Sequence, residues 1–173
     1  MNIKEVSYGV PIGKGSGIYV LCSNKRVEKL NKYDRCGVLY IGRGKNISAN
    51  RLRIKKNGEF DHCSLSYIVD FEKKKLRFFR YDKDGVKHQI KSGILKGAKP
   101  KLFYFYSKNI KDMEAELLIG HIMKYGQSPS LNSSSTKWAY EHKISNVDAW
   151  SKQTFHEYEA FENSLKKIKK QMN

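Results

Sequence analysis

Tyr19 and Tyr40 are the residues whose type and setting are best suited to chemistry. Each stands inside a short β-type run, Gly17 to Cys22 and Val38 to Gly42. A phenol can orient a water molecule or take a proton from it. Its ordinary pKa is about 10, so it needs nearby positive charge or a metal-bound hydroxide to act as a base. The two tyrosines are therefore candidates for activating water, and the alternative is that both are ordinary sheet residues.

Positively charged side chains follow the second run closely. Arg51 can hold a phosphate through two parallel hydrogen bonds and is always charged, with Arg43 and Arg53 as competing candidates. Lys45 and Lys55 are further candidate phosphate contacts. An arginine near a water-activating phenol suits the hydrolysis of a phosphodiester, because negative charge must be stabilised in the transition state. The alternative for each residue is an ordinary place on a solvated surface.

The alternation of side chains along a strand decides how the tyrosines are positioned. Ile18 and Tyr19 fall on opposite faces of the first strand, and Leu39 shares a face with Ile41, opposite Tyr40. If the two strands pair, their aliphatic residues can line a core, while both phenols emerge on the opposite surface. We therefore expect both tyrosines on one face of a sheet.

The charge of the chain indicates a nucleic-acid partner. The 173 residues include 34 Lys and Arg against 17 Asp and Glu, a net charge of +17. Residues 1–100 hold 23 basic and 9 acidic residues, so their net charge is +14. Lysine and arginine displace condensed counterions from phosphates, which makes a basic domain typical of a nucleic-acid binder. A solubilising surface or an acidic partner is the alternative.

Cysteine usage and hydropathy favour a soluble, cytoplasmic protein with no membrane partner. Cys22, Cys36 and Cys63 are odd in number and form no CxxC pair, which argues against a secreted disulfide framework. No apolar run approaches the roughly 18 residues of a membrane helix, and the N-terminus has no signal-peptide pattern.

The strings Gly17-Ile18-Tyr19 and Tyr40-Ile41-Gly42 stand in this order on two strands, ahead of an arginine-bearing helix. This arrangement resembles the GIY-YIG nuclease family over roughly residues 16 to 132. The spacer between the strands is longer than in compact members, and Arg51 comes one residue later than the commonest spacing. Many members carry a histidine or tyrosine where Lys55 stands. Here His62 could substitute for it from a loop, or Lys55 could act as a second phosphate contact.

The resemblance also implies a metal-binding glutamate on a later helix and an asparagine soon after it. Glu116 borders the apolar face of that expected helix, whereas Glu114 lies on its polar side, so Glu116 is favoured over Glu114 as the ligand. It would hold one Mg²⁺ per active site, with Mn²⁺ as a substitute, through oxygen ligands. Asn132 matches the asparagine and is expected at the nucleic-acid interface.

The expected fold is α/β: a small, mainly antiparallel sheet flanked by helices, with an inserted β-hairpin and a C-terminal amphipathic helix. We expect a single domain over 1–173, with a nuclease-like core over 16–132 and an extension over 133–173. Residues 23–37 are expected to form a basic loop or a short helical segment. The expected strands and helix are Ser64–Phe71, Leu76–Tyr81, Val86–Ile90, Leu102–Tyr106 and Met113–Tyr125, the helix capped by Asp112 and ended by Gly126.

Apolar residues recur at steps of three and four near the C-terminus, which predicts an amphipathic helix. The stripe consists of Phe155, Tyr158, Phe161, Leu165 and Ile168. Packing of this stripe on the protein's own sheet is favoured, and a homodimer interface used on DNA is the alternative.

These observations together predict a metal-dependent endonuclease that hydrolyses phosphodiester bonds of double-stranded DNA. Only about 40 residues follow Asn132, too few for another full domain, which favours a stand-alone restriction-type enzyme. The alternatives are a phage or mobile-element nuclease of relaxed specificity, and a non-catalytic nucleic-acid-binding protein. In the last, the tyrosines would stack on bases while the basic face holds phosphates.

Overall fold

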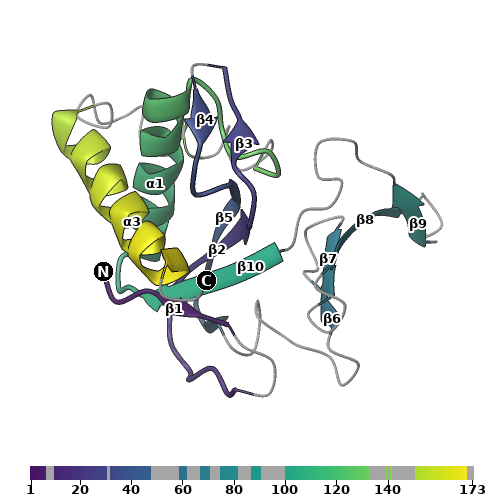
Figure 1. The fold of residues 1–173 in the computed structure, drawn as a ribbon. Coiled ribbons are helices and arrows are strands. Elements are labelled where there is room, and N and C mark those ends of the chain that lie inside the picture. The colour runs from purple at the N-terminus through teal and green to yellow at the C-terminus, as the bar shows by residue number, and fades with distance from the viewer. Residues whose placement is uncertain are drawn as a thin grey trace.

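The computed structural model describes residues 1–6, 10–30, 32–47, 100–132, 139, 141 and 151–170, and the backbone of four strands between 59 and 90. Within these residues the architecture is α/β, with a four-stranded antiparallel sheet and two helices, as the sequence predicts (Figure 1). The expected helix around Arg51 lies outside the described residues, as do Arg53 and Lys55.

The main sheet has the strand order β1-β10-β2-β5, and all of its neighbours are antiparallel. Residues Gly17 to Tyr19 begin β2, and Tyr40 to Gly42 lie within β5, so the two motif strands are hydrogen-bonded neighbours. Their register pairs Tyr19 with Gly42 and Leu21 with Tyr40. The strands of this sheet are β1 (Lys4–Glu5), β2 (Gly17–Ser23), β5 (Val38–Gly44) and β10 (Pro100–Tyr106).

The long connection between β2 and β5 contains a small hairpin. Strands β3 (Val27–Glu28) and β4 (Tyr33–Asp34) pair with each other in an antiparallel manner. The expected basic loop or helical excursion is thus replaced by a two-stranded ribbon in the described part of this segment.

The inserted region forms a separate sheet with the order β6-β7-β8-β9, again antiparallel. The predicted hairpin is present as β8 and β9, the predicted strand Ser64–Phe71 is present as the shorter β7, and β6 is an additional strand. The strands are β6 (Glu59–Asp61), β7 (Tyr67–Asp70), β8 (Lys75–Tyr81) and β9 (Lys87–Ile90).

Helices α1 (Ile110–Tyr125) and α3 (Lys152–Lys170) lie side by side next to the main sheet (Figure 1). Helix α1 begins three residues earlier than predicted: its N-cap is Asn109, and Asp112 lies in the first turn. There Asp112 still favours the helix, because its charge complements the dipole at the N-terminus. Gly126 ends the helix with φ 74°, the left-handed conformation that glycine adopts without strain.

The two faces of the sheet carry different cores. The helix-side core contains Ile18, Val20 and Ile41 with residues of α1 and α3. The tyrosine-side core contains Tyr19, Leu21, Leu39, Tyr40, Ile47, Leu102 and Tyr104. We predicted Leu39 on the face of Ile41, and this was wrong. The register shifts where β5 meets Leu21 and Cys22, so β5 has one extra residue and the alternation reverses there.

The apolar stripe of α3 belongs to the protein's own core. Tyr158, Phe161 and Leu165 are fully buried in the helix-side core, with Ile168 packed against it. This outcome matches the favoured alternative for these four residues, while Phe155 is half-buried and lies outside that core. In the described part of the chain, no helix combines the length and apolar character needed to cross a bilayer.

Candidate functional site

Tyr19 and Tyr40 come together on one face of the sheet, as predicted. Their ring centroids are 5.8 Å apart, with the planes inclined by 33°. The prediction that both phenols emerge on the surface was wrong, because Tyr19 is 1% exposed and Tyr40 6% exposed. Both rings belong to the tyrosine-side core, together with Ile47 and with Leu102 and Tyr104 of the neighbouring strand β10.

Gly42 makes room for this pair. A Cβ atom at this position would stand 2.5 Å from Cε1 of Tyr40 and 2.6 Å from the hydroxyl oxygen of Tyr19. Real Cβ atoms do not approach other atoms so closely, so any other residue at position 42 would displace both rings. The glycine of the second motif therefore fixes the distance between the Tyr19 phenol and the backbone of β5.

Asn132 lies at the free edge of β5 and is fully buried. Its side-chain oxygen accepts a hydrogen bond from the backbone N–H of Ile41 (2.8 Å), and its Nδ2 donates to the carbonyl of the same residue (2.7 Å). The neighbouring Leu131 N–H donates to the carbonyl of Leu39 (2.9 Å). Our prediction that Asn132 contacts nucleic acid is corrected. Its side chain instead pairs with backbone groups at the free edge of β5, and this holds the strand segment beside Tyr40 in place.

Arg43 lies on the opposite face from the tyrosines. It is paired in register with Ile18, which belongs to the helix-side core, and cross-strand partners share a face. Its guanidinium forms an ion pair with Glu114 of α1, with Nη1 and Oε2 2.5 Å apart. The Arg43 side chain is 27% exposed and that of Glu114 only 7%. The structure therefore does not bring Arg43 together with Tyr19 and Tyr40; it ties β5 to α1.

Of the two glutamates of α1, Glu116 lies where the helix periodicity predicts it, and Glu114 does not. Glu114, expected on the polar side, is buried, because Arg43 reaches it from the adjacent strand. Glu116, the favoured metal ligand, is half-buried, which fits a place at the border of the apolar face. Lys45, the residue after β5, is exposed.

Compared with known proteins, the chain matches no protein-family model, no curated protein and no solved structure. Its function must therefore be argued from its own residues.

A second polar group, which was not predicted, adjoins the helix-side core, and its member Cys36 belongs to that core. Among the described residues, Asp34, Cys36 and Glu162 are buried and have ligand atoms within 4.8 Å of one another, so this group could hold a metal ion. These residues come from β4, the turn after it, and α3. The group is separate from Glu116, where we expected the ion.

Both carboxylates of this group already accept hydrogen bonds. Asp34 accepts from the backbone N–H groups of Cys36 (2.8 Å), Gly37 (3.0 Å) and Val38 (2.7 Å), which shapes the turn into β5. Glu162 accepts from Tyr125, Lys124 (3.0 Å) and Lys166 (2.6 Å). The group therefore acts first as a buried polar network that connects β4, α1 and α3.

The electrostatics of this network follow from burial and hydrogen bonding. Burial alone would raise the pKa of Glu162, but hydrogen bonds from Lys166, Tyr125 and Lys124 outweigh it and lower that pKa below 4.5. Burial raises the pKa of the Cys36 thiol to about 12, so the thiol stays protonated at neutral pH. A protonated, soft sulfur atom does not suit Mg²⁺, which prefers oxygen ligands.

Two sequence signals could have revealed this network. Asp34 stands three residues before Gly37, the pattern of a turn in which the aspartate accepts backbone hydrogen bonds. Glu162 lies four residues after Tyr158 and three before Leu165, so it interrupts the apolar stripe of α3. A carboxylate on a buried helix face needs partners, and here Lys124 and Tyr125 of α1 provide them.

Proposed function

We propose that the protein is a metal-dependent endonuclease that hydrolyses phosphodiester bonds of DNA. The observation that carries this proposal is the arrangement of the tyrosine pair. Tyr19 and Tyr40 lie on one face of two neighbouring antiparallel strands, 5.8 Å apart, and Gly42 leaves the space that their rings need. The net charge of +17 supports a polyanionic substrate.

In this proposal Tyr19 orients the attacking water and accepts its proton, and Tyr40 supports it from the adjacent strand. Arg51, which lies outside the described residues, holds the scissile phosphate. Lys45 is exposed at the end of β5 and contacts a neighbouring phosphate. Asn132 keeps Tyr40 in position through the backbone of Ile41, without contacting the substrate.

Glu116 is the proposed ligand of the divalent ion, Mg²⁺ or Mn²⁺. Glu114 is the weaker candidate because its side chain is only 7% exposed and is therefore less accessible to an ion. Glu116 is half-buried on the same helix and offers the oxygen ligands that Mg²⁺ requires. When bound, the ion would stabilise charge on the phosphate and on the leaving oxygen.

The burial of the tyrosines also bears on the non-catalytic alternative. A binding protein that stacks bases on aromatic rings needs those rings at its surface. Tyr19 and Tyr40 are 1% and 6% exposed, so their faces are covered by the protein itself. This burial argues against base stacking. A phage or mobile-element nuclease and a restriction-type enzyme would share this chemistry.

Plasmid cleavage with and without Mg²⁺ tests the proposal. Tyr19→Phe removes a single hydroxyl group and should lower the cleavage rate by about 100-fold or more, the usual contribution of a general base. Tyr33→Phe makes the same change at a residue that is 47% exposed on β4, and should leave the rate unchanged. Wild-type protein that cuts no plasmid with Mg²⁺ or Mn²⁺, or a Tyr19→Phe variant that cuts normally, would contradict the proposal.

A further inference from the structure

A basic pocket lies at the C-terminal end of α3, between that helix and the turn that leads into β5. Its volume is about 360 Å³, and it is lined by Asn24, Arg35, Cys36, Lys166, Lys169 and Lys170. Four of these six residues carry a positive charge and none is acidic. Tyr19 and Tyr40 belong to the core on the other side of the sheet, so this pocket is separate from the proposed nuclease site.

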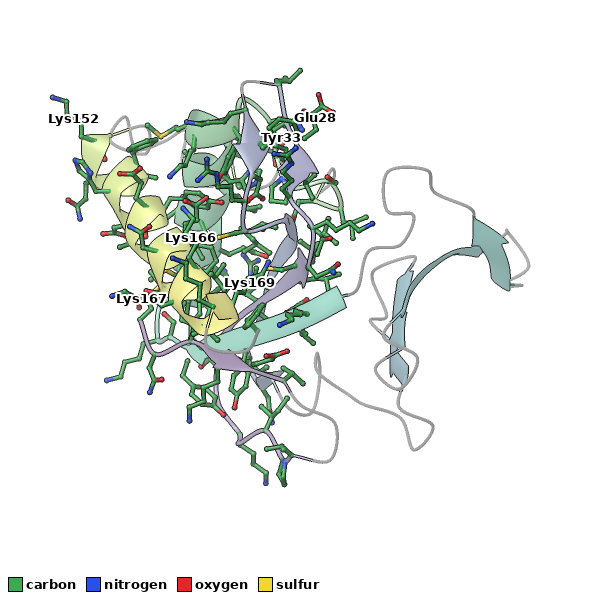
Figure 2. All side chains as sticks on the ribbon, in the orientation of Figure 1. Glu28, Tyr33, Lys152, Lys166, Lys167 and Lys169 are labelled. Carbon is green, nitrogen blue, oxygen red and sulfur yellow. The ribbon has the colours of Figure 1, made fainter. Side chains whose placement is uncertain are left out.

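Two of the four cations are held in place. Lys169 donates hydrogen bonds to the carbonyl groups of Ser23 (2.8 Å) and Cys36 (2.6 Å), which fixes its ammonium between the end of β2 and the turn after β4. Lys166 is fixed by Glu162 at 2.6 Å. Figure 2 shows both lysines on the side of α3 that is turned towards the strands, and Lys167 away from them. The two ammonium groups are therefore positioned before any ligand arrives.

The other two cations, Arg35 and Lys170, are exposed, and no carboxylate among the described residues forms an ion pair with either. Lysines near a helix C-terminus are expected, because they complement the negative end of the dipole. Arg35 has no such reason to be here, since it comes from a different element and still lines the same pocket. Glu162 balances the charge of Lys166. The like charges of the other three residues repel one another, so the arrangement indicates an anionic ligand.

We propose that this pocket binds a terminal phosphate group, that of inorganic phosphate or of a mononucleotide. A terminal phosphate carries nearly two charges at neutral pH, compared with one on a diester. Its three free oxygens can accept from the fork of Arg35 and from ammonium groups at once. The volume lies at the lower end of the range for small-ligand pockets, which suits a ligand of this size.

Calorimetric titration of the full-length protein with inorganic phosphate and with AMP tests the proposal. The buffer contains chloride at low ionic strength and no divalent metal, so nuclease activity plays no part. Both probes should bind the wild type with a Kd of about 1 mM or tighter. The double variant Arg35→Gln/Lys170→Gln should bind both probes about tenfold more weakly, since two charge-assisted hydrogen bonds are lost.

The control is Lys152→Gln/Lys167→Gln, which removes two charges from the same helix outside the pocket. Lys152 is the first residue of α3, at the end opposite the pocket (Figure 2). This variant should keep the wild-type Kd to within about twofold, because exposed charges at a distance are screened. Equal weakening in both variants would show diffuse attraction and overturn the proposal.

Two further probes identify which chemical group the pocket recognises. Methyl phosphate carries a terminal phosphate and should bind like inorganic phosphate, whereas dimethyl phosphate, a diester, should bind about tenfold more weakly. Dimethyl phosphate that binds as tightly as AMP would overturn the assignment to a terminal phosphate. Adenosine that binds as tightly as AMP would show recognition of the base and overturn it as well. Unfolding curves of each variant confirm that these surface changes leave the fold intact.

Discussion

Single residues in this protein owe their roles to partners that come from other elements. The sequence places Tyr19, Tyr40 and Gly42 in strands, and the pairing of those strands could be predicted from that pattern. The apolar periodicity of α1 could not show that Glu114 is the buried glutamate. Glu114 is buried because it pairs with Arg43, which lies on a strand about 70 residues earlier. Patterns within one element indicate which face is apolar, but they do not indicate which polar residue finds a distant partner.

Glu162 allows a test at the residue scale. Its pKa is lowered in the folded protein, so its contribution to stability is fully present above the unfolded pKa, near 4.5. That contribution is lost as the pH falls through the lower folded value. Glu162→Gln should therefore lower the free energy of unfolding at pH 7 by about 3 kcal/mol, as expected for breaking a buried ion pair. The deficit should begin to shrink below about pH 4.5, where the carboxyl of the unfolded chain takes up a proton, and should be smallest below the lower pKa of the folded protein.

Urea unfolding at pH 7 and at pH 3 measures both effects. Glu159→Gln is the matched control, because Glu159 also pairs with Lys124 at 3.0 Å but its side chain is 40% exposed. It should cost less than about 1 kcal/mol at either pH. A Glu162→Gln deficit of the same size at both pH values would refute the idea that the charge of Glu162 is what stabilises the network.

At the scale of elements, the strands and helices follow the sequence pattern, while their exact pairing does not. β10 and α1 appear within three residues of the predicted bounds, because apolar periodicity and Gly126 signal them locally. The bulge at Leu39 has no local signal, since it depends on how β5 pairs with β2. The same holds for the loop at Leu131 and Asn132, which completes the edge of β5 only after folding.

Asn132 provides the test at this scale. Asn132→Ala leaves the N–H and carbonyl of Ile41 buried without their partner, which should lower the free energy of unfolding by about 2–4 kcal/mol. Asn132→Asp should be equally harmful, because a carboxylate oxygen would then face the Ile41 carbonyl. Asn109→Ala is the control: Asn109 makes no side-chain capping bond, so its loss should cost little. Urea unfolding of the three variants measures these changes in the free energy of unfolding. An Asn132→Ala protein as stable as the wild type would show that the edge strand does not need this side chain.

At the scale of the whole molecule, charge is the property that could be predicted most directly. Net charge depends only on composition, whereas the location of charge depends on the fold. Lys29, in the basic segment between the motif strands, proved to be 5% exposed, so it is not available to a polyanion. Lys45 is exposed next to the end of β5, whereas Arg35 and Lys170 are exposed at the pocket beside the C-terminal end of α3. The exposed positive charge is therefore spread over more than one place.

The salt dependence of DNA binding tests the partner that this charge implies. Lysine and arginine residues that neutralise phosphates release counterions, so the logarithm of the affinity should fall linearly with the logarithm of salt concentration, by about 0.9 per contact. With a net charge of +17 we expect several contacts, and a slope of about −4 or steeper. Titration of a 5′-hydroxyl duplex without divalent metal, between about 50 and 200 mM salt, measures the slope without cleavage.

The pocket variant Arg35→Gln/Lys170→Gln should keep a slope within about one contact of the wild type, because its pocket takes a terminal phosphate that this duplex lacks. A flat response in the wild-type protein would mean that its excess charge serves a partner other than nucleic acid.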